Sequence, residues 1–324
     1  MRVLLAGGAG YIGSALTPKL LQRGYDVDVL DLCWFGQEVP APARLIEQDV
    51  LEVSVDQLRG YDAVVFMAGV SNDPMADYSP ARNFIGNAAG PAYLAYMAKR
   101  AGVPRFIYAS SCSVYGYSQD RLYDEDAPTI CSYPYGISKL QGEFAVLGMR
   151  DESFHVIALR KGTVSGYSPR MRLDLVVNTM FRTALAEGRI VVNNPAIWRP
   201  VLSMQDTIAA YIRALECEPS VEGVFNIASG NYTVGEIADQ VQEALRDLLE
   251  LDTAIEIRQV PDLRNYKVST ERAERELGFK PTHDIRAIVK DLADNRDSFR
   301  DFDNPAYYNI QIFRSLKARG HHPA

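Results

Sequence analysis

The chain has 324 residues, a length that suggests either two domains or one large α/β domain. Its 47% hydrophobic and 23% charged residues are typical of a soluble globular protein, and its net charge of −7 argues against nucleic acid or an anionic membrane as a partner. The four cysteines form no CxxC pair, which argues against a zinc site or a disulfide framework and favours reduced thiols in the cytoplasm.

No apolar run is long enough to cross a bilayer. The longest is AVVFMAGV at 63–70, and glycines interrupt the N-terminal run VLLA, which argues against a signal peptide. The four histidines show no metal-ligand spacing, so we expect no metal site. They are His155, His283, His321 and His322.

Short apolar segments alternate with helical ones in the first half of the chain. The predicted strands are 2–6, 26–31, 62–68, 105–110 and 155–160, and helices are predicted at 14–24 and 91–102. Strands that are apolar on both faces and alternate with helices indicate a doubly wound parallel sheet of the Rossmann type.

The pattern becomes less regular after about residue 165. Helices are predicted at 176–188 and 234–250, and a strand at 223–229 is expected to return to the first sheet. We therefore predict a dinucleotide-binding domain of residues 1–165 with returning segments at about 200–229. Residues 166–199 and 230–324 are predicted to form a smaller mixed domain, in which the tail beyond Asp301 shows no interpretable pattern.

The segment GGAGYIG joins the first predicted strand to the first helix. Its glycines Gly7, Gly10 and Gly13 have the spacing GxxGxxG, which suits a tight turn and a close approach of the backbone to a diphosphate. The helix N-terminus after the turn would face that anion, with Tyr11 and Ile12 in the first turn. A structural turn with chance glycines is the alternative.

Asp31 ends the next predicted strand, where a carboxylate can bind the two ribose hydroxyls of a dinucleotide. No Arg or Lys follows in LCWFGQ to bind a 2′-phosphate, so NAD is favoured over NADP. Asp49 and Val50 are candidates to flank the adenine, although Asp49 could be a plain loop acid.

The stretches YASSCSVYG (108–116) and YPYGISK (133–139) carry candidate catalytic residues. Tyr135 and Lys139 lie four residues apart on one helical face. Lowering the pKa of Tyr135 from about 10 to about 7 takes about 4 kcal/mol, which Lys139 and an oxidised nicotinamide could supply. The tyrosine could then remove a hydroxyl proton while Ser111 aligns the substrate oxygen.

In this order, GGAGYIG, SSCSVYG, YGISK and WRPVLSMQD (198–206) resemble the extended short-chain dehydrogenase/reductases of the nucleotide-sugar epimerase/dehydratase group. The resemblance runs from Met1 to about Pro281. It implies tightly held NAD, a C-terminal domain that grips a nucleoside diphosphate, and a homodimer. By motif match the catalytic residues are Ser111, Tyr135 and Lys139.

The resemblance also implies further contacts. Ala68 and Asn87 would join Tyr135 and Lys139 beside the cofactor, although Asn87 could be a helix-packing amide. The implied substrate-binding residues are Ser71, Ser111, Cys112, Ser113, Lys161, Asn178, Arg199 and Arg264. Guanidinium groups such as those of Arg199 and Arg264 suit phosphate oxygens, although each alone could be a surface residue.

The chain departs from the family pattern at two places. Dehydratases carry an acid just after the catalytic hydroxyl, where this chain has Cys112 and Ser113, which argues against 4,6-dehydration. Cys112 could be an acid/base or a small packed thiol. Lys161 replaces the usual aromatic residue, and it could meet a substrate carboxylate, carry a proton or be structural.

These features together predict a cytoplasmic, NAD-dependent epimerase that inverts C4 of a nucleoside-diphosphate sugar through a 4-keto intermediate. The alternatives are an atypical dehydratase, a C5-epimerase or a ketoreductase of a deoxysugar pathway. A non-catalytic NAD-sensing protein is the alternative from another class, and a retained Ser-Tyr-Lys set argues against it.

Overall fold

The computed structural model describes residues 1–260 and 264–318. Seven strands form its main sheet; the ends of six agree with predicted strands to within two residues, and the strand at 44–47 was not predicted. The seven strands are β1 (Arg2–Ala6), β2 (Asp26–Asp31), β3 (Arg44–Glu47), β4 (Ala63–Phe66), β5 (Arg105–Ser111), β7 (His155–Lys161) and β11 (Gly223–Ile227).

All neighbouring strands of this sheet are parallel, in the order β11-β7-β5-β4-β1-β2-β3. The strand order reverses between β1 and β4, which is the switch point of a doubly wound Rossmann fold. The predicted fold class is therefore confirmed, and β11 returns to the first sheet as expected.

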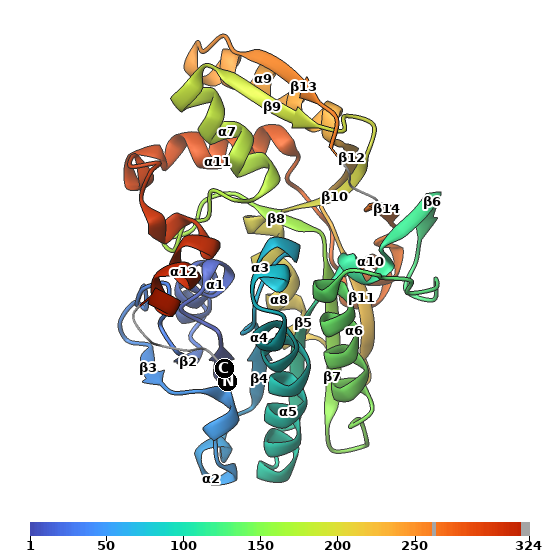
Figure 1. Cartoon of the computed structure of the whole chain (residues 1–324). Coiled ribbons are helices and arrows are strands. Elements are labelled where there is room, and N and C mark those ends of the chain that lie inside the picture. The colour runs from blue at the N-terminus through green and yellow to red at the C-terminus, as the bar shows by residue number, and fades with distance from the viewer. Residues whose placement is uncertain (261–263, 319–324) are drawn as a thin grey trace.

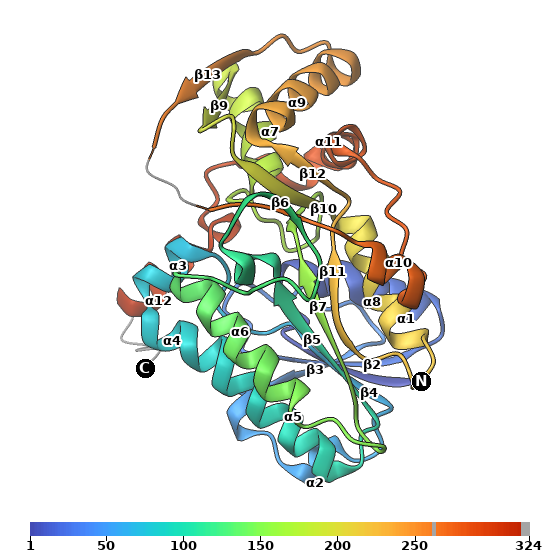
Figure 2. The same ribbon diagram turned by 90° about the vertical axis from the view of Figure 1, so that its right-hand side faces the viewer.

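Helices cover both faces of the main sheet (Figures 1 and 2). One face packs against α1 (Tyr11–Gln22) and α8 (Met204–Glu216), and the other against α5 (Gly90–Ala101) and α6 (Pro134–Leu147). Alternation along each strand divides the core between the faces, because successive side chains of a strand point to opposite sides. Thus Val3 and Leu5 belong to the α1 side, whereas Leu4 and Ala6 belong to the α5 side.

Short helical segments connect the strands of the first half. They are α2 (Val55–Leu58), α3 (Asp73–Tyr78), α4 (Pro80–Phe84), the 3-10 turns η1 (Val50–Glu52) and η3 (Cys112–Tyr115), and the π-helical turn η2 (Ile85–Ala89).

The less regular part of the chain lies above the carboxyl edge of the main sheet in Figure 1. Three small sheets lie in this region. The first contains β8 (Thr163–Ser165), β10 (Trp198–Ser203) and β12 (Gly230–Thr233), and the second pairs β9 (Arg189–Asn193) with β13 (Ala254–Arg258). The third pairs β6 (Tyr117–Tyr123), which comes from the first half of the chain, with β14 (Asn265–Val268). Its helical segments are α7 (Val176–Glu187), α9 (Val234–Leu249), α10 (Glu271–Leu277), α11 (Ile285–Asp294), η4 (Arg296–Phe299), η5 (Pro305–Tyr307) and α12 (Asn309–Ala318).

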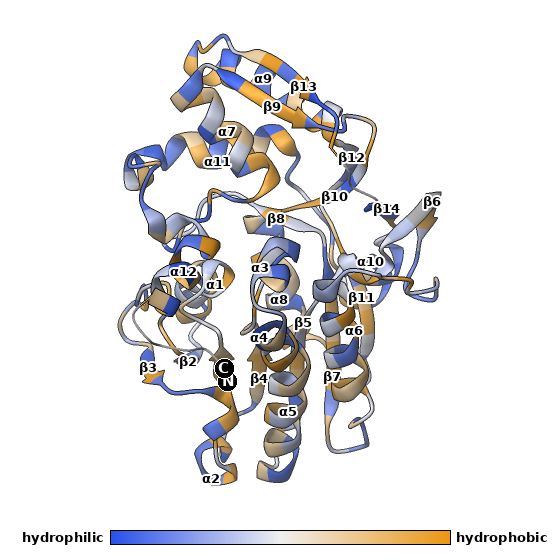
Figure 3. Cartoon of the chain, in the orientation of Figure 1, coloured by the Kyte–Doolittle hydropathy of each residue, from blue (hydrophilic) through white to orange (hydrophobic). Residues whose placement is uncertain are grey.

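One apolar cluster joins the two parts, because it continues from Val3 and Leu16 through Phe181 to Phe299. Figure 3 shows hydrophobic residues both on β4 of the main sheet and on β9 of the upper part. The division into a cofactor domain and a substrate domain at the predicted boundaries stays a prediction.

Candidate active site

A cleft with two adjoining cavities lies at the carboxyl edge of the main sheet. The larger cavity, of about 450 Å³, has the size of a small-molecule site and is lined by residues that end or follow β1, β4, β5 and β7. The second cavity lies over the end of β2, and the two share Gly7, Gly10 and Ala68. In parallel α/β sheets ligands bind at this edge, beside the switch point.

The glycine loop forms the wall between the two cavities. Gly7 has a φ of +83°, and a Cβ there would lie 2.3 Å from the backbone nitrogen of Ala68, so the turns after β1 and β4 approach too closely for a side chain. Gly10 is the N-cap of α1 and offers no side chain to bind the first N–H groups. Together with Tyr11, Ile12 and Gly13, which line the larger cavity, this backbone fits the diphosphate of a dinucleotide.

The second cavity is lined by Asp31, Asp49 and Val50, which were predicted to bind the adenosine, and by Ala68, which was predicted to lie beside the cofactor. The Asp31 carboxylate accepts hydrogen bonds from the backbone nitrogens of Ala9 (3.0 Å) and Cys33 (2.9 Å), which hold it at the strand end. Burial raises the pKa of Asp31. The Asp49 carboxylate accepts a hydrogen bond from the backbone nitrogen of Leu51 at 3.0 Å and so caps η1. This contact favours the alternative that Asp49 is a loop acid and not an adenine contact.

Asn87 does not line either cavity. It is fully buried in η2, and its Nδ2 donates to the carbonyl of Val70 (2.8 Å) and to Asn83 Oδ1 (2.9 Å). The geometry therefore favours the alternative of a helix-packing amide over the expected cofactor contact, because Nδ2 is bound by protein groups and the side chain is fully buried.

Ser111, Tyr135 and Lys139 meet at the larger cavity. Ser111 ends β5, and its Oγ accepts from Ser113 nitrogen at 3.2 Å. Tyr135 and Lys139 project from α6 across the same edge, and Lys139 Nζ lies 6.0 Å from the Tyr135 ring centroid and donates to the carbonyl of Ala109 at 3.0 Å.

The electrostatics of Tyr135 differ from the sequence expectation. Burial raises the pKa of Tyr135 to about 12, and a hydrogen bond with Ser111 and the charge of Arg172 act in the opposite direction. Burial and, secondarily, the charge of Lys161 lower the pKa of Lys139 to about 7. The protein groups alone therefore do not lower the pKa of Tyr135, because desolvation disfavours the charged forms of both side chains. That Lys139 and an oxidised nicotinamide together lower it toward 7 stays a prediction.

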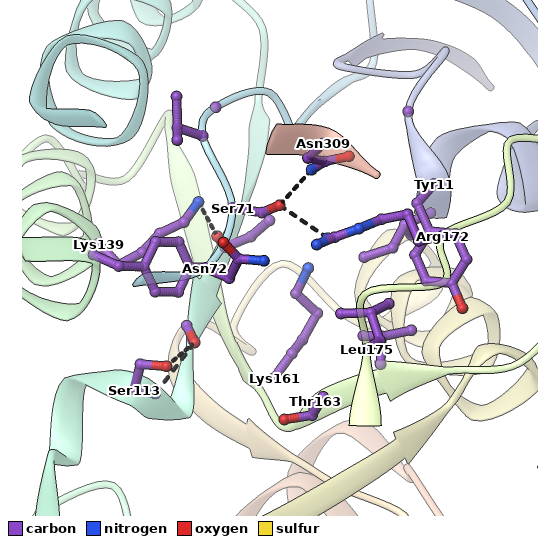
Figure 4. A pocket seen from close by; sticks show the side chains of 18 of the residues that line it. Tyr11, Ser71, Asn72, Ser113, Lys139, Lys161, Thr163, Arg172, Leu175 and Asn309 are labelled. Atoms are coloured by element: carbon purple, nitrogen blue, oxygen red, sulfur yellow. Dashed lines mark hydrogen bonds between the residues drawn. The ribbon is translucent and has the colours of Figure 1, made fainter. Parts of the chain in front are cut away.

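Lys161 lies one strand away from Ser111, its direct partner in the register between β5 and β7. Its ammonium donates to the Tyr211 hydroxyl at 3.1 Å, and burial lowers its pKa to about 7. Figure 4 shows its nitrogen pointing into the cavity below Arg172. Ser71 and Ser113 line the same cavity.

Arg199 and Arg264 lie together in the larger cavity, and neither lines the second cavity. Arg199 donates to the carbonyl of Arg264, and Arg264 forms an ion pair with Asp73 at 2.5 Å. The structure thus brings together two arginines that the sequence proposed for one diphosphate, although Arg199 lies on β10 and Arg264 precedes β14, 65 residues farther along the chain.

Two other predicted substrate residues lie outside the cavity. The Cys112 thiol is buried, its burial raises its pKa well above the usual range, and it donates to the carbonyl of Arg160. Asn178 is fully buried and donates to the Tyr11 hydroxyl (3.0 Å) and to the carbonyl of Arg172 (2.7 Å). Neither therefore contacts a ligand directly, because neighbouring protein groups occupy their polar atoms.

Among the residues of the larger cavity that sequence reasoning missed are Arg170, Arg172 and Asn309. Arg172 donates to Asp174 at 2.8 and 2.9 Å and to Ser71 at 2.9 Å. The segment SPRMRLD, with two arginines beside an acid, was the signal for the first two. Asn309 lies in the tail beyond Asp301, which shows no recognisable motif.

Comparisons with known proteins agree with this geometry. Residues 3–228 match the model of the NAD dependent epimerase/dehydratase family. The chain is 29% identical to a UDP-glucose 4-epimerase of Corynebacterium glutamicum (90% of this chain, 94% of the relative) and 26% identical to a dTDP-glucose 4,6-dehydratase of Streptomyces niveus (87% and 88%). Among solved structures, MoeE5 in complex with UDP-glucuronic acid and NAD superposes with a TM-score of 0.81 at 25% identity, over 92% of this chain and 100% of that one.

The described residues show neither a membrane-spanning helix nor a metal-binding cluster. Residues 1–260 and 264–318 contain no helix with the length and apolar character needed to cross a membrane. Over the same ranges, His, Cys, Asp and Glu side chains do not gather in groups of three or more that could hold a metal ion.

Proposed function

Since the chain belongs to the NAD dependent epimerase/dehydratase family, we propose that it is an NAD-dependent epimerase that inverts C4 of a nucleoside-diphosphate sugar. The observation that carries the proposal is the placement of Ser111, Tyr135 and Lys139 in one cavity with the glycine loop. A binding protein would gain nothing from this arrangement of acid–base groups.

The geometry assigns a role to each of these side chains. Tyr135 removes the proton of the C4 hydroxyl, and Ser111 donates to the same oxygen and aligns it. The chemistry that NAD supplies when bound is reversible acceptance of a hydride from C4. Lys139, at the base of the cavity, stabilises the negative charge on Tyr135, and Tyr135 returns the proton after the 4-keto sugar has presented its other face.

Arg199 and Arg264 would bind the diphosphate of the substrate, because guanidinium groups match phosphate oxygens. NAD is favoured over NADP because Asp31 lies in the second cavity, where a carboxylate repels a 2′-phosphate. UDP-glucose and UDP-glucuronic acid are the first substrates to test, since related proteins are named for them or bind them.

The carboxylates around the larger cavity argue against dehydration. Among its described lining residues the acids are Asp73 and Asp174, and each is paired with an arginine, Arg264 and Arg172 respectively. Elimination of water needs an acid and a base at neighbouring carbons. An acid held in an ion pair is a poor proton donor.

C5 epimerisation is the second candidate, and Lys161 is the observation that favours it. Its nitrogen points into the cavity, its strand position adjoins Ser111, and a lysine with a pKa of about 7 is partly neutral at physiological pH. A neutral amine can remove the C5 proton next to a 4-keto group.

Turnover of a panel of nucleotide sugars in deuterated water, followed by NMR of the products, tests the proposal. C4 epimerisation predicts the 4-epimer, no net NADH and no deuterium at C5. Deuterium at C5 that disappears in Lys161→Met would favour the second candidate. A dehydrated product, or no conversion of any sugar, would refute epimerisation.

We also propose a cytoplasmic homodimer. The four cysteines are all unpaired, which suits a reducing compartment. Tyr96 on α5 and Phe144 on α6 are 50% and 63% exposed on neighbouring helices, and a second copy of the chain would cover them. Analytical ultracentrifugation of Phe144→Glu should give a monomer, and an unchanged dimer would exclude this face.

A further inference from the structure

The C-terminal helix α12 contributes one residue to each of the two cavities. Asn309 lines the larger cavity and Phe313 lines the second one, so a single helix extends along the cofactor cleft. The helix packs against α3, and the two lie side by side in Figure 2. Both side chains are buried, at 6% and 2% exposure, although the helix is near the end of the chain.

Phe313 is the centre of a small apolar cluster at the second cavity. It packs edge-on against Trp34 at 5.5 Å between ring centroids and stacks on Phe35 at 6.1 Å. Trp34 and Phe35 follow Asp31, the residue predicted to bind the adenosine ribose, and all four line the cavity. An aromatic wall beside a ribose-binding carboxylate suits the flat face of an adenine ring.

Asn309 belongs to a polar network that crosses the cleft. Its Nδ2 donates to Ser71 Oγ at 3.0 Å, and its Oδ1 accepts from the Arg170 guanidinium at 2.5 Å. Ser71 also accepts from Arg172 (Figure 4). The network connects α12 to the loop after β8 and to the loop after β4.

Arg170 is a buried cation that faces the glycine loop. Its backbone nitrogen donates to Ser14 Oγ at 3.2 Å, and the neighbouring Ser168 donates to the carbonyl of Tyr11 at 2.6 Å, so its loop is fastened to the first turn of α1. The side chain is 4% exposed, and its Nε has no hydrogen-bond partner among the described residues.

A buried guanidinium with an unsatisfied donor is unfavourable until an anion binds it. Burial lowers the pKa of Arg170 to about 9, which reflects that cost. The charges of Asp174 and Asp31 act in the opposite direction, but no hydrogen bond joins Arg170 to a carboxylate among the described residues. Arg170 lines the same cavity as Gly10 and Tyr11. The anion that Arg170 would bind together with the backbone at Gly10 and Tyr11 is a diphosphate.

We propose that Arg170, Asn309 and Phe313 form the second half of the cofactor site, in which Arg170, held by Asn309, binds the diphosphate and Phe313 covers the adenine. This inference rests on the proposed function only in taking the dinucleotide to be NAD. It makes α12 part of the binding site, so that NAD leaves only when this helix moves, and the cofactor stays bound between turnovers.

The test measures NAD and nicotinamide mononucleotide binding by titration calorimetry on protein stripped of cofactor, and NAD content after gel filtration of untreated protein. The variants are Arg170→Met, Asn309→Ala and Phe313→Ala, with Arg314→Ala, an exposed residue of the same helix, as the control. Arg170→Met and Phe313→Ala should each weaken NAD binding at least about 10-fold, as expected for loss of a charge-assisted bond or a ring contact.

The mononucleotide separates the roles because it carries no adenine. Phe313→Ala should leave its binding unchanged, whereas equal losses for NAD and the mononucleotide would mean a general collapse and overturn the assignment. If Arg170→Met and Phe313→Ala retain NAD to the same extent as the control Arg314→Ala, the assignment is also overturned. Wild-type protein that holds NAD but converts no nucleotide sugar would instead refute the epimerase proposal and leave this one standing.

Discussion

Replacement of Tyr135 by phenylalanine should abolish turnover and leave the fold intact. The change deletes one hydroxyl, whose hydrogen bond with Ser111 is worth about 1 kcal/mol of stability. The ring, its position on α6 and its packing near Lys139 are retained.

The magnitude follows from the electrostatics of the cavity. With the protein groups alone the pKa of Tyr135 is about 12, so forming the phenolate at pH 7 costs about 7 kcal/mol, at about 1.36 kcal/mol for each pH unit. The bound cofactor and the substrate must offset most of this cost. Because phenylalanine cannot accept the proton at all, kcat should fall by about 10³-fold or more.

The assay is interconversion of the two epimers on a confirmed nucleotide sugar, with NAD content and the thermal midpoint measured on the same preparation. Tyr133→Phe is the matched control, because Tyr133 precedes the same helix and its ring faces Arg264 at 5.6 Å, outside the residues that line the cavity. A Tyr135→Phe variant that loses less than about 10-fold in kcat would show that another group is the base.

Four further outcomes are expected. Asp31→Asn should lower the preference for NAD over NADP by about 10-fold in calorimetric titrations, and an unchanged ratio would show that the carboxylate does not meet the ribose. Glu143→Ala removes the buried partner of Arg160, which it binds at 2.6 Å, and should lower the free energy of unfolding by about 3–5 kcal/mol in chemical denaturation; a loss under about 1 kcal/mol would contradict the pairing. Cys112→Ala should keep most of its turnover, because the thiol faces a carbonyl and not the cavity, and an inactive but folded variant would return it to the catalytic candidates. Lys161→Met should stabilise the protein more at pH 6 than at pH 9, because a lysine whose pKa falls from 10.5 to about 7 on folding destabilises the folded state fully below pH 7 and progressively less above it; an equal gain at both pH values would exclude a titrating Lys161.

Local patterns in the sequence determined the fold class and the cofactor loop. Strand and helix periods, the glycine spacing and the YxxxK spacing each involve residues within one or two neighbouring elements, so they are readable without the tertiary structure. The carboxyl ends of parallel strands then bring Gly7, Asp31, Ser111 and Lys161 to one edge, a consequence of topology that the alternation of elements already implied.

Other features of the site depend on burial and on contacts between residues far apart in the chain. The pKa values of Tyr135 and Lys139 are set by desolvation, which a spacing rule does not contain. Cys112 and Asn178 match family positions but point into protein, since side-chain direction depends on the local turn and its neighbours. Asn309 meets Ser71 across 238 residues of sequence, and no periodic pattern encodes such a contact, because it arises only when the folded sheet and the α12 helix pack around the same cleft.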